Sequence, residues 1–278
     1  MLYKNIKGLS SSHFKRLTGV KKDVFSQMHD CINKYKHAKR KHPTRGKPPK
    51  LSNADKLLLL LMYYREYRSQ FHIGMTYGIS ESRVCEIIGE MERILIADKR
   101  FHLPGKKTLL KEENQYEVVL VDVTESPVER PKKKQRGHYS GKKKRHTQKT
   151  QVVVEKKSRK IICVAFDKGR KHDFRLFKES KTYIHPNTKC AVDTGYQGIA
   201  KLHPNVEIPK KRSKKNPLTE QDKERNKNIS SERVLVENII REVKIFRILA
   251  EKYRNRRRKF GLRFNLIAAI YNLNLSFI

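Results

Sequence analysis

The stretch EVVLVDV (residues 117–123) decides the fold class, because it is a run of β-branched and apolar residues with one acid near its end. Such a run is typical of a buried β-strand. KTQVVVEKK (149–157) and KIICVAFD (160–167) are two more such runs, and the short basic segment between them predicts a hairpin. TKCAVDTGY (188–196) predicts a fourth strand that ends in an acid and a turn.

Helices are predicted between and after these strands. HDFRLFKES (172–180) is expected to be helical, and a long, mainly buried helix is expected over about 231–253. The order of three strands, a helix, a strand, a basic loop and a helix predicts a mixed α/β fold.

Residues 51–97 predict three further helices. Ser52 is the expected N-cap of the first, the second covers about 69–77, and Ser80 is expected to cap the third after the turn GIS (78–80). The third has an apolar stripe with helical spacing, made of Val84, Ile87, Ile88, Met91 and Leu95. This order is the helix-turn-helix pattern. The outward face of the third helix mixes acids with arginines, which suits groove reading poorly, so DNA reading and a plain helical bundle both stay open.

The chain is strongly basic. Its 278 residues contain 65 Lys and Arg against 28 Asp and Glu, a net charge of +37. A compact protein with this surplus repels itself unless a polyanion screens it, so nucleic acid is the expected partner. The basic residues concentrate in four blocks, at 37–50, 131–149, 209–215 and 252–264. The first is rich in proline and predicts an extended linker, and together the four predict a surface that follows a phosphate backbone.

The sequence also limits the compartment. It has no run of about 18 apolar residues, and its start lacks the apolar region of a signal peptide. The four cysteines are scattered and show neither a disulfide framework nor a zinc spacing. We therefore expect a cytoplasmic, nucleoid-associated protein without a membrane partner.

Three acids stand out in this basic chain. Asp122 lies inside an apolar strand and Asp193 ends another, which is costly unless the carboxylate binds a positive group or caps a turn, and both alternatives stay open. Glu237 shares a polar stripe of the long predicted helix with Arg233, Arg241 and Lys244. That stripe is either a salt-bridge ladder or a metal-binding glutamate beside phosphate-binding cations.

Two aspartates and a glutamate could together supply oxygen ligands for hard divalent cations. Mg²⁺ is bound by few carboxylates and keeps its other positions for water and substrate phosphates. A pair of such ions would activate the attacking oxygen and stabilise the leaving one.

Six blocks of the sequence resemble, in the same order, those of DDE-superfamily transposases of the insertion-sequence family-five type, which are related to Harbinger-type nucleases. They are VDVTESPVERP, GHYSGKKKRHTQKTQVVV, GRKHDFRLFKES, VDTGYQGI, ERVLVENIIREVKIFRIL and IAAIYNLN, and they span about 117–275. Residues 51–95 resemble the helix-turn-helix segment of that family. The resemblance implies an α/β fold with an RNase H-like mixed sheet and flanking helices, preceded by a small all-α helix-turn-helix domain. The expected divisions are a basic N-terminal segment and linker (1–50), a helix-turn-helix domain (51–100) and the DDE catalytic domain (115–278).

The resemblance also implies roles for single residues. Asp122, Asp193 and Glu237 match the catalytic, metal-binding acids, with two Mg²⁺ or Mn²⁺ ions expected. A related signature of Tyr, Arg, Glu and Lys is matched at all positions except the first, where Ser230 stands. The expected DNA contacts are Arg233, Lys244, Arg241, Lys142, Lys143, Lys144 and Lys149. Glu125, Asp173 and His172 are expected to lie next to the three acids and to orient them without binding the metal directly.

The resulting hypothesis is a metal-dependent transposase of a bacterial insertion sequence. It would bind double-stranded DNA at the transposon ends and at the target, cleave a phosphodiester, and transfer the freed strand in the same site. A homodimer or a higher oligomer on DNA is expected. Two alternatives stay open, namely a site-specific endonuclease without joining activity and a non-catalytic basic nucleic-acid-binding protein.

Overall fold

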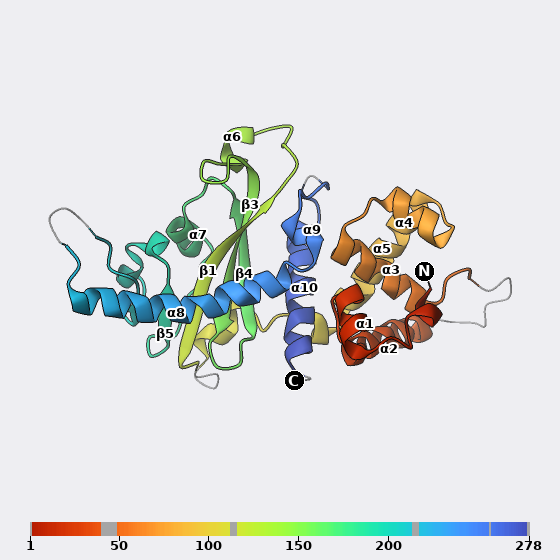
Figure 1. The fold of residues 1–278 in the computed structure, drawn as a ribbon, viewed down its shortest axis with the longest axis horizontal. Helices are drawn as coiled ribbons and strands as arrows, with labels where there is room; N and C mark the ends of the chain where they lie inside the picture. Colours follow the sequence, from red (N-terminus) through yellow and green to blue (C-terminus); the bar gives the residue numbers. More distant parts are fainter. Residues whose placement is uncertain (1, 40–48, 112–115, 213–216, 256, 277–278) are drawn as a thin grey trace. The chain divides into compact units, whose positions relative to one another are not determined.

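The strand predicted at 117–123 is the central strand of a mixed sheet (Figure 1). This strand, β1 (Val118–Pro127), pairs antiparallel with β3 (Arg145–Glu155) and parallel with β5 (Lys189–Val192). β3 pairs in turn with β4 (Ile161–Lys168), which gives the predicted hairpin. Two short strands extend the sheet, β2 (Tyr139–Ser140) beside β3 and β6 (Val206–Glu207) beside β5. The predicted mixed α/β fold class is confirmed.

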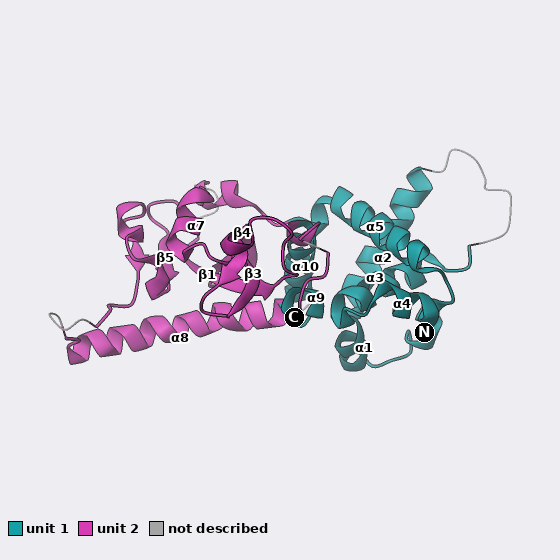
Figure 2. Ribbon diagram, turned by 90° about the horizontal axis from the view of Figure 1, so that it is seen from above, with its two compact units in different colours: residues 1–102, 244–251, 262–278 teal, residues 103–243, 252–261 magenta. Residues whose placement is uncertain are grey.

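The computed structural model describes residues 2–39, 49–111, 116–212, 217–255 and 257–276. The chain divides into two compact units (Figure 2). Unit 1 is Met1–His102 with Lys244–Glu251 and Leu262–Ile278, and unit 2 is Leu103–Val243 with Lys252–Gly261. The sheet belongs to unit 2. Residues 40–48 of the predicted linker (37–50) and 213–215 of the third basic block lie outside the described residues.

One face of the sheet carries the main apolar core of unit 2. Alternate side chains of a strand point to opposite faces, so Val119 and Val121 share one face of β1. They pack with Val192 of β5 and with Phe177 of helix α7 (Asp173–Glu179) in a cluster of buried residues. The helix predicted over 172–180 is therefore present and covers this face.

Helix α8 (Glu220–Val243) lies against β1 and β5 and crosses the sheet on its other side, the side of Leu120 and Asp122 (Figure 1). The expectation of a long, mainly buried helix over 231–253 was wrong in its bounds and in its burial. α8 begins at Glu220 and ends at Val243. Only four of its residues are buried, namely Ile229, Val236, Ile239 and Val243. Its first nine residues, 220–228, are all charged or polar, and acids lie in the first turn, where the helix dipole favours them, so α8 extends here without an apolar face.

Unit 1 is helical. The three helices predicted over 51–97 are α3 (Asn53–Glu66), α4 (Gln70–Tyr77) and α5 (Glu81–Ala97). The hydroxyls of Ser52 and Ser80 accept hydrogen bonds from backbone N–H groups at the start of α3 and α5, as predicted for N-caps. The predicted apolar stripe of α5 is buried throughout, in Val84, Ile87, Ile88, Met91 and Leu95.

Helices from both ends of the chain complete unit 1. Within the predicted N-terminal segment 1–50, α1 (Ser11–Thr18) and α2 (Lys22–Ala38) pack on α3, and α2 also contacts α5. From the C-terminal part come α9 (Arg247–Ala250) and α10 (Phe260–Leu275), of which the part from Leu262 belongs to this unit. No helix within the described ranges is long and apolar enough to cross a membrane.

Unit 1 contains a buried ion pair. Arg263 Nε of α10 donates to Glu92 Oε1 of α5 at 2.7 Å, and the hydroxyl of Tyr64 donates to the same oxygen at 3.0 Å. The side chains of Arg263 and Glu92 are 5% and 1% exposed. Two hydrogen bonds to one carboxylate oxygen help to compensate for burying the charge. The bond from Arg263 joins α10 to α5, and the bond from Tyr64 joins α3 to α5.

Candidate active site

Strand register brings the two predicted aspartates together. Val121 of β1 and Val192 of β5 are the last partners in the parallel ladder. Asp122 directly follows Val121, and Asp193 directly follows Val192. Neighbouring parallel strands lie about 4.8 Å apart, and residues level with each other point to the same face. The two carboxylates therefore leave the sheet side by side, on the face that α8 crosses.

Helix α8 adds Glu237 and a cation. Arg233 Nη2 lies 3.4 Å from Asp193 Oδ2 and 3.6 Å from Glu237 Oε1, so one guanidinium links the helix acid to the strand acid. The i, i+4 spacing of Arg233 and Glu237 places them on one side of α8. The salt bridge predicted as one alternative for the polar stripe is therefore present, and it extends to a strand aspartate. The metal-binding role of Glu237 stays a prediction.

The surroundings of Asp122 make its charge costly. Burial raises the pKa of Asp122 to about 6. The hydrogen bond from the Val123 backbone N–H, 2.8 Å long, and the charge of Arg233 lower this pKa, whereas the charges of Asp193 and Glu237 raise it further. Both of the other acids are therefore close enough to affect the proton affinity of Asp122.

The acids differ in exposure. Asp122 is partly buried, the side chain of Asp193 is 38% exposed and that of Glu237 is 57% exposed. Asp193 also caps the turn that follows it, because its Oδ1 accepts hydrogen bonds from the backbone N–H and the hydroxyl of Thr194. Its second oxygen remains for Arg233. The site is thus closed on the sheet side and open to solvent at Glu237.

The donor set suits a hard divalent cation, since all three residues offer carboxylate oxygens. Within the part of the chain that the structure describes, no three such side chains form a ready-made metal cluster. The cation that the acids do collect is the guanidinium of Arg233, which bridges Asp193 and Glu237. The residues fit a metal in the kind of oxygen ligand that they offer, and closing them on an ion would require Arg233 to move away from between Asp193 and Glu237.

Glu125, Lys149 and Asp173 form a separate polar group. Glu125 is an odd-numbered residue of β1, so it points to the face opposite Asp122. Its ladder partner is Lys149, and its Oε2 accepts a hydrogen bond from the hydroxyl of Thr147 at 2.7 Å. Lys149 Nζ lies 2.6 Å from Asp173 Oδ1, and its side chain is only 12% exposed. The carboxylate of Asp173 in turn lies beside Gly195, where an added Cβ would be 3.2 Å from Oδ2.

The remaining predicted residues are spread over the surface. His172 is exposed and directly precedes α7. Lys142, Lys143 and Lys144 form an exposed turn between β2 and β3, and Arg241 is exposed on α8. Lys244 follows the end of α8 and belongs to unit 1, so the helical stripe inferred for Glu237 stops before it.

Tyr196 was not among the predicted site residues. Its side chain is 1% exposed, and its hydroxyl has no hydrogen-bond partner among the described residues. Burial raises the pKa of this hydroxyl well above its ordinary value, and the charges of Asp122, Asp173 and Asp193 act in the same direction. Tyr196 therefore lies close behind the acids. The signal in the sequence was its place at the end of DTGY (193–196), the turn that begins with Asp193.

Comparison with known proteins identifies relatives of both parts of the chain. The family described as DDE superfamily endonuclease matches residues 121–272, and the helix-turn-helix of DDE superfamily endonuclease matches residues 49–98. A protein of Microchaete diplosiphon, described as a probable transposase for insertion sequence element IS702, is 47% identical over 276 residues, which cover 99% of each chain. No solved structure matches the chain.

Proposed function

The chain belongs to the DDE superfamily of endonucleases, and from this premise we propose that it is the transposase of a bacterial insertion sequence. The resemblance inferred from the six sequence blocks is thereby confirmed at the level of the family. The finer proposal is that the protein binds the DNA ends of its element, cleaves a phosphodiester in a metal-dependent reaction, and transfers the freed strand to target DNA.

One observation carries this proposal. Asp122, Asp193 and Glu237 come from β1, the end of β5 and α8, and yet the charges of Asp193 and Glu237 both raise the pKa of Asp122, while Arg233 reaches both of these acids. Acids that repel one another are not brought together for stability, especially in a chain with so few of them. A shared positive ligand is the physical reason for such an arrangement.

We infer that Asp122, Asp193 and Glu237 hold the metal, expected to be two Mg²⁺ or Mn²⁺ ions. When bound, such ions would make a water or a DNA hydroxyl nucleophilic and would offset the charge on the leaving oxygen. The chain's own part is positional, since the sheet fixes the two aspartates by register and α8 presents Glu237 from the open side. Arg233 neutralises the acids and is the candidate for the contact nearest to the scissile phosphate.

The proposed DNA contacts follow exposure. Lys142, Lys143 and Lys144 form an exposed turn, and Arg241 is exposed on α8, as suits side chains that position a phosphate backbone without reading bases. Lys149 pairs with Asp173, so a contact of Lys149 with DNA requires this ion pair to open. Lys244 belongs to unit 1, so its proposed DNA contact is a contact of that unit. The helix-turn-helix match to 49–98 supports double-stranded DNA as the partner, and pairing two ends suggests a homodimer or a higher oligomer.

The test is cleavage and joining of labelled duplexes that carry the ends of the element encoding this chain, with Mg²⁺ or Mn²⁺. Asp122→Ala and Glu237→Ala should lose both reactions and keep DNA binding. The matched control is Glu232→Ala, which removes another acid of α8. Glu232 pairs with Lys156 at 2.7 Å and not with Arg233. This control should keep its activity.

Other results would favour the alternatives. Metal-dependent cleavage without joined products would indicate a site-specific endonuclease. Equal activity in Asp122→Ala and in the unaltered protein would remove the three acids from the chemistry. DNA binding with no cleavage under any metal would indicate a non-catalytic binding protein.

A further inference from the structure

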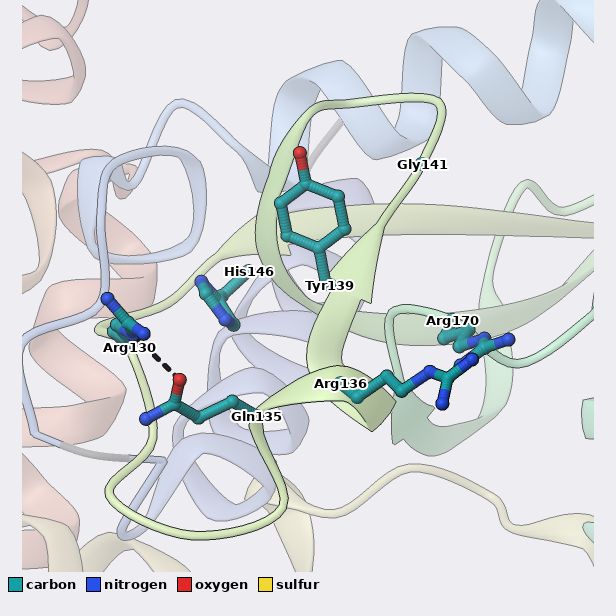
Figure 3. Close-up of a pocket in the computed structure, with 7 residues that line it drawn as sticks. All are labelled: Arg130, Gln135, Arg136, Tyr139, Gly141, His146 and Arg170. Carbon is teal, nitrogen blue, oxygen red and sulfur yellow. Dashed lines mark hydrogen bonds between the residues drawn. The ribbon is translucent and has the colours of Figure 1, made fainter.

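A hollow of about 750 Å³ lies in unit 2 at the end of the β1–β3 ladder (Figure 3). It is lined by side chains of the loop after β1, of the short helix α6 (Gln135–His138), of β2 and β3, and of the turn after β4. The residues are Arg130, Gln135, Arg136, Tyr139, Gly141, His146 and Arg170. Among the described residues that line it there is no acid and none of the proposed catalytic residues.

Two arginines give the hollow a positive side. The side chains of Arg136 and Arg170 extend toward the same region in Figure 3. Their segments are joined by a hydrogen bond from the Arg170 backbone N–H to the Gly137 carbonyl, 3.2 Å long. Within the described residues no acidic side chain pairs with either guanidinium. Two neighbouring guanidinium groups without an acid repel each other, and a phosphate would remove that repulsion with forked hydrogen bonds.

An aromatic ring lines another side of the hollow. Tyr139 is 42% exposed, and its ring meets the imidazole of His146 edge to face, with centroids 5.7 Å apart. The two residues are ladder partners of β2 and β3, so the backbone holds them in register. Arg130 Nε donates to Gln135 Oε1 at 2.7 Å, and this bond closes a third side (Figure 3). Stacking on an aromatic ring is how proteins bind unpaired bases of any sequence.

The shape of this surface separates it from a duplex contact. A duplex backbone is followed by projecting cations such as the exposed turn Lys142–Lys144. An open hollow whose volume lies within roughly 300–1,000 Å³ has room for a compact ligand instead. A nucleotide offers both groups that the hollow can bind, since its phosphate suits the arginines and its base suits the tyrosine ring.

The hollow also lies at a defined distance from the acids. Asp122 and Pro127 are five residues apart on β1, and Pro127 is the ladder partner of Thr147, next to His146. At about 3.3 Å per residue the separation is roughly 17 Å. This length corresponds to about five base pairs, since each strand of duplex DNA advances 3.4 Å per nucleotide.

We propose that the hollow binds one unpaired nucleotide of the DNA substrate, displaced from the duplex within about five base pairs of the cleavage position. The proposal rests on the proposed function and adds to it a subsite. Arg136 and Arg170 bind the phosphate of this nucleotide, and Tyr139 stacks on its base. Unpairing a nucleotide costs free energy, which reduces the affinity for a fully paired duplex. DNA that is already unpaired at this position therefore binds more tightly.

The experiment measures binding of the full-length chain to 30-base-pair end duplexes in EDTA, so that cleavage does not interfere. One duplex is fully paired, and a series carries a single mispaired thymine at successive positions near the cleavage site. We expect about tenfold tighter binding for a mispair at one position of the series. Tyr139→Ala should abolish this preference, whereas Tyr139→Phe should keep it, because phenylalanine also stacks.

Two matched controls address exposure and charge. Tyr183→Ala removes a tyrosine that is 60% exposed elsewhere in unit 2, and it should keep the preference. Arg136→Ala and Arg170→Ala should weaken the preference, whereas Arg225→Ala, which removes an exposed arginine of α8, should not. Equal affinity for paired and mispaired duplexes in the unaltered protein would overturn the subsite but leave the proposed function standing. Failure to bind any of the duplexes would count against both.

Discussion

Arg233 of α8 reaches Asp193 at the end of β5, with 3.4 Å between Nη2 and Oδ2. This contact joins the helix to the sheet across the group of acids. It also explains how three carboxylates are tolerated together, because a guanidinium lies within reach of two of them and lowers the pKa of the third. The same arrangement leads to predictions on stability that do not depend on catalysis.

Replacing Arg233 with Gln should destabilise the protein in EDTA by about 1 kcal/mol, because the acids lose their cation. With Mn²⁺ the deficit should shrink, since the ion supplies the missing positive charge. Urea unfolding with EDTA and with Mn²⁺ measures both values. Arg225→Gln, an exposed arginine on the same helix, should change neither. A deficit that Mn²⁺ leaves unaltered would show that Arg233 acts only through packing.

Replacing Asp122 with Asn should stabilise the protein in EDTA by about 1 kcal/mol, since functional groups held in unfavourable surroundings commonly lower stability. Burial and the charges of Asp193 and Glu237 all oppose the charge of Asp122, and an amide of the same shape removes that opposition. The measurement is the free energy of unfolding at pH 7.5. A loss of stability would mean that Asp122 is held by favourable contacts and that the crowding of the acids is harmless.

The ion pair of Glu92 with Arg263 should be essential to unit 1. Glu92→Ala leaves a guanidinium that is 5% exposed without its carboxylate, so we expect a loss of about 3–5 kcal/mol in the free energy of unfolding. The pair Arg83–Glu86 has nearly the same N–O distance, 2.6 Å, but its side chains are 50% and 63% exposed. Glu86→Ala should therefore cost well under about 1 kcal/mol. Similar losses at the two sites would contradict the role of burial.

Because of Asp98, the stability of unit 1 should fall at acid pH. Its side chain accepts hydrogen bonds from the Arg100 side chain and backbone N–H at the start of the short 3-10 helix Lys99–Phe101, and the Arg100 side chain holds the pKa of Asp98 well below its ordinary value. A depressed carboxyl pKa stabilises the fold above the unfolded value of about 3.9, and this contribution is lost as the pH falls through the folded pKa.

Asp98→Asn should accordingly lower the free energy of unfolding at pH 7 by about 1 kcal/mol, and the difference from the unaltered protein should narrow below about pH 4. Chemical unfolding at a series of pH values measures this. A difference that stays constant down to pH 2 would assign the effect of Asp98 to its shape and not to its charge.

Local patterns were sufficient for much of this protein. β-branched runs predicted β1 and the hairpin of β3 and β4, and serine caps with an apolar stripe predicted α3 and α5. The pattern also singled out Asp122, Asp193 and Glu237, because acids in or after apolar segments of a basic chain are conspicuous. These features depend on neighbours in the sequence, which is why periodicity and propensity detect them.

Only the tertiary structure decided which residues meet. The register of Val121 with Val192 places the aspartates level with each other, and a shift by one residue would turn either of them to the other face. The ion pair of Lys149 with Asp173 and the hollow beside Tyr139 likewise had no local signal. The physical reason is that register, ion pairing and concavity arise from contacts between segments far apart in the chain. Composition and periodicity describe each segment only by itself.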